Sequence, residues 1–249
     1  MRKISLITLM LVFISLLGIN SATAQEKKES KPYDLSLDLM SRYIWRGLDF
    51  GSAPSIQPGF TFEKSGFTFG AWGAYTIASG AQEADIFVSY TYKKTFSATI
   101  TDYFFPNEVG AYKYFNYKAD ETGHLVEATL KFEGTKKLPL TALIAVNVWG
   151  ADAKRHSSLG AVTGNQYSTY AELGYTFKSI DFFMGANLTD PKENRFETGF
   201  YGDEIGITNL GMTLSKDIPV TSKFSLPLQI SLITNPQANK IYMVAGFSF

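Results

Sequence analysis

Charged side chains recur at every fourth position of the stretch YDLSLDLMSRYIWRG, residues 33–47. They are Asp34, Asp38, Arg42 and Arg46, and the odd-numbered positions between them are mainly leucine and aromatic residues. Because successive side chains of a β-strand point to opposite faces, an extended strand here has one charged and one apolar face. Fixed charges that face water lower the barrier to the passage of polar solutes, which is transport rather than reaction chemistry.

The same alternation continues along the chain. If the strands form a barrel, the polar side chains of one phase line its inner wall. The predicted lumen-facing residues are Asp34, Asp38, Arg42, Arg46, Gln57, Asp85, Glu127, Lys131, Glu172, Asn187 and Gln229. Acids and bases mixed along such a wall would orient small polar or charged solutes. The alternative is that these charges neutralise one another and only hold the wall together.

Hydrolytic chemistry has less support in the sequence. The chain has two histidines: His124 opens a predicted strand, and His156 lies in the loop sequence KRHSSLG beside Ser157 and Ser158. Adjacent serine and histidine do not make a catalytic pair unless a third group orients the imidazole ring. We therefore expect no enzyme activity, and an outer-membrane hydrolase that modifies lipids is the enzymatic alternative.

No metal or cofactor site is predicted. The loop TDPKENRFETGFYGDE, residues 189–204, contains five acidic residues, but their spacing matches no EF-hand loop. The chain has no cysteine, which excludes disulfides and thiolate chemistry. It also contains no glycine-rich phosphate-binding motif. We expect the acidic loop to be exposed to solvent.

The elements that must position these residues are predicted from a two-residue period, which recurs in about 12 segments such as SIQPGFTF, VEATLKF and LPLQISL. Short connections such as 93–95 alternate with long ones such as 105–123, as in strands that cross a membrane back and forth. The sequence therefore predicts an all-β fold, a transmembrane antiparallel up-and-down β-barrel of about 12 strands. The alternation changes phase between Ile207 and Leu210, which a β-bulge would explain.

The N-terminal residues predict export. Arg2 and Lys3 precede an apolar run that ends in Ala-Thr-Ala, which indicates a signal peptide over residues 1–24 and a barrel over 25–249. No other segment approaches the ~20 apolar residues of a membrane-spanning helix. The chain has 23 basic and 23 acidic residues, a balance that offers no electrostatic basis for binding nucleic acid. We expect the protein in the bacterial outer membrane.

Aromatic residues in the outward phase are predicted to form girdles at the membrane interfaces. They are Tyr43, Trp45, Phe60, Phe62, Tyr90, Tyr92, Tyr175 and Phe177. The last strand, KIYMVAGFSF, places Phe247 and Phe249 at alternate positions, which resembles the signal that the β-barrel assembly machinery reads. The predicted partners are thus outer-membrane lipid, this machinery and small solutes.

The stretch SRYIWRGLDFGSAPSIQPGF, followed by SGFTFGAWGAY, resembles the TorF-like outer-membrane porin family, also called the GCW-CHP domain family. The residues that carry the resemblance are Ser41, Tyr43, Trp45, Arg46, Gly47, Pro54, Gln57, Gly70, Ala71, Trp72 and Gly73. The match is specific over residues 38–75, and Arg42 departs from the acidic residue that is frequent in the family. The resemblance implies an outer-membrane barrel with a porin role.

Together these features predict a porin-like channel for the passive diffusion of small polar or charged solutes. A barrel of 12 strands would have a lumen about 10 Å wide once side chains line it. The alternative is a structural or adhesive barrel that does not conduct.

Overall fold

The computed structural model describes residues 31–106, 113–119 and 121–249. The chain divides into two units, Met1–Lys31 and Pro32–Phe249, and the second unit contains all of the strands. The predicted signal peptide, residues 1–24, lies outside the described residues.

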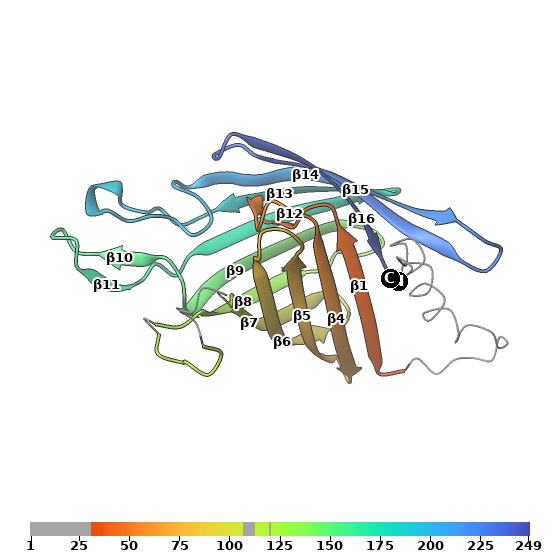
Figure 1. The fold of residues 1–249 in the computed structure, drawn as a ribbon, viewed down its shortest axis with the longest axis horizontal. Coiled ribbons are helices and arrows are strands. Elements are labelled where there is room, and N and C mark those ends of the chain that lie inside the picture. The colour runs from red at the N-terminus through yellow and green to blue at the C-terminus, as the bar shows by residue number, and fades with distance from the viewer. Residues whose placement is uncertain (1–30, 107–112, 120) are drawn as a thin grey trace, which may run out of the picture. The chain divides into compact units, whose positions relative to one another are not determined.

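Twelve strands of the second unit form a closed antiparallel barrel (Figure 1). They are β1 (Tyr33–Met40), β4 (Ser55–Lys64), β5 (Phe67–Thr76), β6 (Gln82–Tyr92), β7 (Phe96–Phe104), β8 (His124–Phe132), β9 (Leu140–Gly150), β12 (Thr169–Phe177), β13 (Ile180–Asn187), β14 (Gly206–Pro219), β15 (Ser225–Asn235) and β16 (Lys240–Ser248). Each strand pairs with its neighbours in chain order, and β1 pairs with β16 to close the barrel. The predicted all-β, up-and-down barrel of about 12 strands is confirmed.

Two further hairpins form separate small sheets. One pairs β2 (Ile44–Trp45) with β3 (Leu48–Asp49), and the other pairs β10 (Lys154–His156) with β11 (Val162–Asn165). Both are built from long connections at the same end of the barrel, the first between β1 and β4 and the second between β9 and β12. The connections at the opposite end are short, as at Ser65 and Gly66, whose φ angles of 54° and 85° suit a two-residue hairpin turn.

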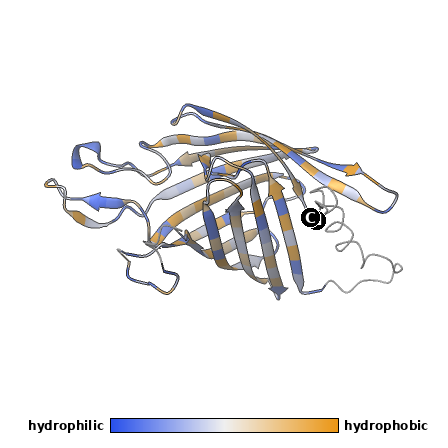
Figure 2. Cartoon of the chain, viewed as in Figure 1, coloured by the Kyte–Doolittle hydropathy of each residue, from blue (hydrophilic) through white to orange (hydrophobic). Residues whose placement is uncertain are grey.

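The barrel wall has an outer face of exposed apolar side chains and an inner face whose residues are more polar and more buried. Along β6, Glu83 and Asp85 are buried whereas Ile86, Val88 and Tyr90 are exposed. Figure 2 shows hydrophobic and hydrophilic residues alternating along the strands. The alternation follows from the two-residue period of a β-strand, so the lumen side of each strand can be identified from its burial pattern.

The inner face also contains apolar residues and close contacts with glycine. Ile233, Tyr242 and Val244 form a buried cluster against which Met40 and Ile44 pack. A Cβ at Gly185 would lie 1.8 Å from the Tyr170 hydroxyl, so the missing side chain makes room for this ring to lie along the wall.

The predicted bulge in β14 is confirmed. Gly185 pairs with Asn209 and Ala186 pairs with Ile207, which leaves Thr208 as the extra residue of that strand. A bulge re-aims the backbone locally. This one places the Thr208 carbonyl against the hairpin described below.

Helical structure is minimal among the residues that the structure describes. One 3-10 turn, η1 (Glu193–Arg195), is present in the connection between β13 and β14. Within the part of the chain that the structure describes, no helix has the length and hydropathy needed to cross a membrane.

Candidate functional site, an arginine-tipped hairpin

Strand β1 ends at Met40, and the chain then turns inward as a β-hairpin over residues 43–50, which we call the inserted hairpin. The Phe50 amide donates to the Tyr43 carbonyl at 3.0 Å, and Trp45 pairs with Leu48 across a two-residue turn. That turn consists of Arg46 and Gly47, whose φ angles are 51° and 79°. Two consecutive left-handed residues are what a type I′ hairpin turn requires.

Gly47 packs against the barrel wall at β14. A Cβ at this position would lie 1.9 Å from the Thr208 carbonyl oxygen, so no side chain fits without moving the backbone of the hairpin or of β14. Asn235 of β15 donates from Nδ2 to the Gly47 carbonyl at 3.2 Å. The tip of the inserted hairpin is therefore in contact with both β14 and β15.

Arg46 forms a two-bond ion pair with Glu127 on β8. Its Nη1 lies 2.5 Å from Oε2 of Glu127, and its Nη2 lies 3.0 Å from Oε1. The two side chains are 10% and 1% exposed, which places the pair out of reach of most water. Paired donors that match a carboxylate in this way are among the stronger polar interactions in proteins.

Aromatic rings surround the guanidinium. The Arg46 Cζ atom lies 4.5 Å from the Trp45 ring centroid, 4.7 Å from that of Tyr170 and 5.3 Å from that of Tyr201. The Tyr201 hydroxyl also accepts a hydrogen bond from Arg46 Nη1 at 2.7 Å. Each cation–π contact contributes about 0.5–2 kcal/mol, more where the cation is desolvated.

A polar network ties this ion pair to the barrel wall. Glu127 accepts a hydrogen bond from Thr129 at 2.7 Å, and Tyr201 lies 3.0 Å from Glu127 Oε2 and 3.1 Å from the Asn147 side-chain oxygen. Asn147 in turn donates to Asp152 at 3.0 Å. Glu127, Tyr201, Asn147 and Asp152 are at most 4% exposed, and each has at least one hydrogen-bond partner, as buried polar groups usually do.

A second branch of the network runs along β12 and β14. Tyr170 donates to Glu172 at 2.5 Å, and Asn209 donates to both of these side chains at 3.1 and 3.0 Å. Since the Tyr170 ring also stacks on Arg46, this branch orients one wall of the aromatic enclosure.

The connection between β13 and β14 reaches the same site and is held by Asn187 and Glu197. Asn187 donates to the carbonyls of Thr189, Gly202 and Glu204 at 2.8–3.1 Å. These bonds hold the loop that carries Tyr201 next to the inserted hairpin.

Glu197 joins this loop to the β10–β11 hairpin. It accepts a hydrogen bond from Arg155 at 2.6 Å and others from the backbone amides of His156 and Lys192. Burial of the carboxylate raises its pKa, but these hydrogen bonds lower it more, to about 2.

The prediction of an outward-facing aromatic girdle is wrong for two residues, Tyr43 and Trp45. Tyr43 is buried against the rings of Phe50 and Trp72, and Trp45 contacts Tyr103 and Tyr201, so neither lies on the outer face. The physical reason is that the wall strand stops at Met40, and the alternation of residues 43–46 belongs to the inserted hairpin. The remaining predicted girdle residues lie on the outer face, with Tyr90, Tyr92, Tyr175 and Phe177 all exposed. Phe60 is exposed and Phe62 half-buried in the same phase.

The predicted lumen residues fall into two groups. Arg46, Glu127, Glu172 and Asn187 meet in the network around the inserted hairpin. The others lie elsewhere: Arg42 pairs with Asp49 at 3.5 Å, Gln57 bonds to Ser55, Lys131 pairs with Glu133, and Gln229 bonds to Ser248. Asp34 and Asp38 lie on β1, and Asp85 lies on β6 beside Glu83. Arg46 is thus an interior group paired with Glu127.

Several residues of the site were not predicted. Tyr170 is an aromatic residue without a polar signal of its own, Tyr201 lies in a long connection without strand periodicity, and Asn147 lies in the almost continuously apolar segment 140–149. Glu83 has the same strand phase as Asp85 and could have been found from that alone.

The two histidines have no nucleophile among their hydrogen-bond partners in the described part of the chain. His124 is fully buried, with Nδ1 2.9 Å from Asp102 and Nε2 2.6 Å from the Tyr114 carbonyl oxygen. His156 has a buried Nδ1 without a partner. No group of three or more metal-ligating His, Cys, Asp or Glu side chains occurs among the residues that the structure describes.

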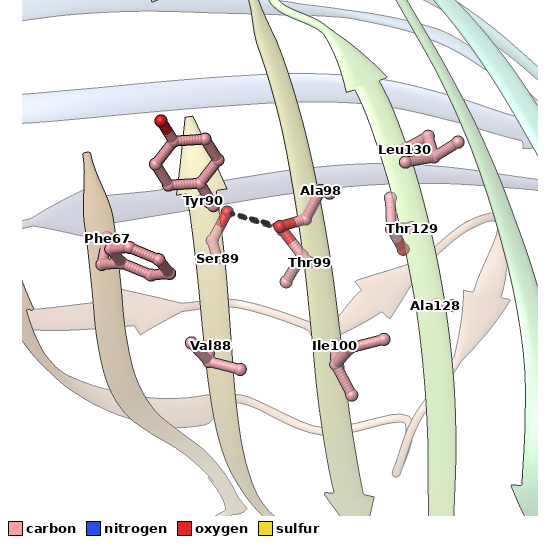
Figure 3. Close-up of a pocket in the computed structure, with 10 residues that line it drawn as sticks. All are labelled: Phe67, Val88, Ser89, Tyr90, Ala98, Thr99, Ile100, Ala128, Thr129 and Leu130. Atoms are coloured by element: carbon pink, nitrogen blue, oxygen red, sulfur yellow. Dashed lines mark hydrogen bonds between the residues drawn. The ribbon is translucent and has the colours of Figure 1, made fainter. Parts of the chain in front are cut away.

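A recess of about 240 Å³ is found in the wall rather than beside the inserted hairpin. It is lined by residues of β5 to β8, with Phe67, Tyr90 and Leu130 at its edges and Ala98 between them (Figure 3). Its apolar side chains, such as Phe67, Ile100 and Leu130, are among the exposed residues of the outer face.

Comparisons with known proteins identify a family and add little about function. Residues 26–222 match the model of a family described as "Bacterial protein of unknown function (Gcw_chp)". No curated protein matches the chain. A solved chain described as "Unveiling the Mechanism Behind the in-meso Crystallization of Membrane Proteins" is similar with a TM-score of 0.41 and 5% identity, over 86% of this chain and 82% of that chain. A likeness at that level supports no argument about function.

Proposed function

Because the chain belongs to the bacterial Gcw_chp family, we propose that it is an outer-membrane β-barrel channel for small polar or charged solutes, which the inserted hairpin closes in the conformation described here. This extends the family description to a porin role of the TorF-like kind. The observation that carries the proposal is the closed 12-strand barrel with an apolar outer face and a polar inner face.

The outer face supports a membrane location. Leu35, Leu130 and Met243 are 71%, 61% and 77% exposed, and water is an unfavourable environment for that much apolar surface. A closed barrel pairs every wall strand on both sides, which is the condition for spanning hydrocarbon with strands. We propose that the β-barrel assembly machinery inserts the chain and that lipid covers this face.

The inner face supports a pathway for polar solutes. Below the inserted hairpin the wall presents hydroxyl groups, for example Ser89 and Thr99, which bond to each other at 2.8 Å, and Thr213 with Ser231 at the same distance. A 12-strand barrel is about 10 Å wide inside when only wall side chains fill it. Withdrawal of residues 43–50 would therefore free a passage of the size that small solutes need.

A second candidate is a barrel that never conducts. The specific observation in its favour is the Arg46–Glu127 pair with its aromatic enclosure, which makes withdrawal of the hairpin costly. Breaking a buried ion pair costs about 3–5 kcal/mol, and each 1.4 kcal/mol lowers the open population about tenfold. We propose no catalytic activity, metal or cofactor for either candidate.

Planar-bilayer recording tests the channel proposal. Wild-type protein is expected to show rare, discrete conductance steps, and a variant in which a Gly-Ser linker replaces residues 43–50 is expected to conduct most of the time. The matched control replaces residues 157–161, the tip of the β10–β11 hairpin, and should behave as wild type. A linker variant that folds and does not conduct would favour the structural barrel instead.

Location is tested separately from conductance. The mature protein should fractionate with outer membranes and migrate faster on gels when unboiled, because a closed barrel resists detergent. Recovery as a soluble periplasmic protein without a mobility change on heating would contradict the membrane proposal.

A further inference from the structure

Two carboxylates of β6 are buried together at the base of the inserted hairpin. Glu83 and Asp85 lie two residues apart on the inner face, 4% and 6% exposed. Tyr43 of the hairpin faces these two carboxyl groups. An ionised carboxylate can only accept hydrogen bonds, so two neighbouring carboxyl groups can bond to each other only when one of them carries a proton.

The titratable groups next to the pair are phenols and a carboxyl group, and that carboxyl group, Asp102, is itself paired with His124 at 2.9 Å. These groups are Tyr43 from the hairpin and Tyr103 and Asp102 from β7. Within the described ranges, neither carboxylate forms an ion pair with a lysine, arginine or histidine, while Arg46 is bonded to Glu127 and Arg42 to Asp49. Two negative charges in this position would be desolvated and would repel each other.

Each carboxyl group also keeps one oxygen without a partner. Oε2 of Glu83 and Oδ1 of Asp85 are buried and have no hydrogen-bond partner. A cavity of about 10 Å³ lies beside Glu83 and is lined by Tyr43 and Phe50 of the hairpin and by Thr76 of β5. That volume holds about one water molecule, which could carry a proton to or from the pair.

We propose that Glu83 and Asp85 form a proton-binding site that holds one shared proton while the inserted hairpin is seated. Loss of this proton to water leaves two carboxylates side by side against Tyr43, and their repulsion then favours withdrawal of the hairpin base. Acidic conditions therefore stabilise the closed conformation and alkaline conditions favour the open one. Only the consequence for opening rests on the proposed channel function.

The proton itself is tested by infrared spectroscopy on protein in lipid vesicles at neutral pH. A protonated carboxyl group gives a C=O stretching band that an ionised carboxylate lacks. We expect this band in the wild type and its loss in both Glu83→Gln and Asp85→Asn, two nearly isosteric variants. Asp217→Asn, at an exposed position of β14, should keep the band. A wild type without the band, or variants that both retain it, would overturn the site.

The coupling to the hairpin is tested by amide hydrogen exchange of residues 43–50 as the pH rises, with exchange rates corrected for intrinsic pH dependence. In the wild type, protection of these amides should fall at least about tenfold as the proton leaves, which corresponds to about 1.4 kcal/mol. Glu83→Gln cannot create a second charge, so its protection should stay constant. An unchanged wild-type profile would refute the coupling, and it would do so whether or not the barrel conducts.

Discussion

At the scale of single residues, Arg46 combines an unfavourable backbone with favourable side-chain contacts. A non-glycine residue at φ 51° pays about 1–2 kcal/mol for the left-handed conformation. The ion pair to Glu127 and three aromatic contacts more than offset that cost, because they form in a site that excludes water. In this left-handed conformation the guanidinium of Arg46 reaches Glu127 on β8.

Replacing Arg46 should reveal the strength of this pair. Arg46→Met keeps the length of the side chain but leaves Glu127 buried without its cation, so the free energy of unfolding should fall by about 3–5 kcal/mol. Arg42→Met is the matched control, because Arg42 is more exposed and its ion pair with Asp49 is longer, and it should cost less than about 1 kcal/mol. Urea unfolding in lipid vesicles, followed by tryptophan fluorescence, measures both. Equal losses for the two variants would show that the Arg46 pair contributes no more than a surface pair.

Gly47 should be the least replaceable residue of the hairpin. Gly47→Ala places a Cβ 1.9 Å from the Thr208 carbonyl oxygen, so the hairpin tip must move away from β14. Gly160 is a matched control, since its φ is 82° and the nearest atom to an added Cβ is 3.8 Å away. Gly160→Ala should therefore lose only the roughly 1 kcal/mol of the backbone strain.

Protection of the Arg46 and Gly47 amides against hydrogen exchange distinguishes the two glycine variants. It should drop in Gly47→Ala and stay at the wild-type value in Gly160→Ala. Full protection in Gly47→Ala would mean that the contact with Thr208 relaxes at little cost.

At the scale of elements, the sequence was sufficient to predict the strands of the barrel wall and insufficient to predict the hairpin inside the barrel. Periodicity predicted the strands and the bulge at Thr208, because burial on one face imposes a period of two along each strand. The same period persists from Tyr43 to Trp45, where the chain is still extended but has left the wall. Periodicity cannot detect that departure, and the Arg-Gly turn that marks it is compatible with a strand end.

The network around Arg46 could not be assembled from sequence. Glu127 and Tyr201 lie 81 and 155 residues from Arg46, and only the closed barrel brings them together. Phase alone selected Glu127 and Glu172 as inward-facing, but it does not say which inward-facing charges meet.

The loop between β13 and β14 should loosen in acid. Because Glu197 has a pKa of about 2 in the folded chain and an ordinary value of 4.5, its hydrogen bonds stabilise the loop fully above about pH 4.5. This stabilisation is lost progressively as the pH falls towards 2. Cleavage by pepsin beside the exposed Phe196 should therefore accelerate over that interval by more than the enzyme's own pH dependence predicts.

Two variants check this assignment. Glu197→Gln should be cleaved rapidly at every pH of the series, because the neutral side chain resembles the protonated acid. Glu193→Gln, in the same loop, should follow the wild type. If the pH dependence of pepsin cleavage in Glu197→Gln is the same as in the wild type, a group other than Glu197 causes the acid sensitivity.

At the scale of the whole molecule, the seam between β1 and β16 is the shortest pairing in the barrel. Only Asp38, Leu39 and Met40 pair with Ser248, Phe247 and Gly246 as ladder residues. Phe249 extends the seam, since its amide and carbonyl each bond to the backbone of Leu37 at 3.1 Å. A seam this short depends on each of its backbone hydrogen bonds more than the longer pairings do.

Deleting Phe249 should therefore lower the yield of folded barrel strongly, both by shortening the seam and by removing a residue that the assembly machinery is predicted to read. Deleting Asn194, in an exposed 3-10 turn, should leave the yield near that of the wild type. The fraction that runs as a compact band on unboiled gels measures both. Equal yields would remove Phe249 from either role.

The long sequence separations of the hairpin contacts have a consequence for the order of events during synthesis and insertion. Gly47 is translated early, yet the residue that donates to its carbonyl, Asn235, follows 188 residues later. Contacts of such separation form late, because the intervening chain must first be ordered. The seated hairpin tip thus marks a barrel in which all strands from β8 to β15 are in place, and in a chain truncated before Glu127 the Arg46 cation would remain in water.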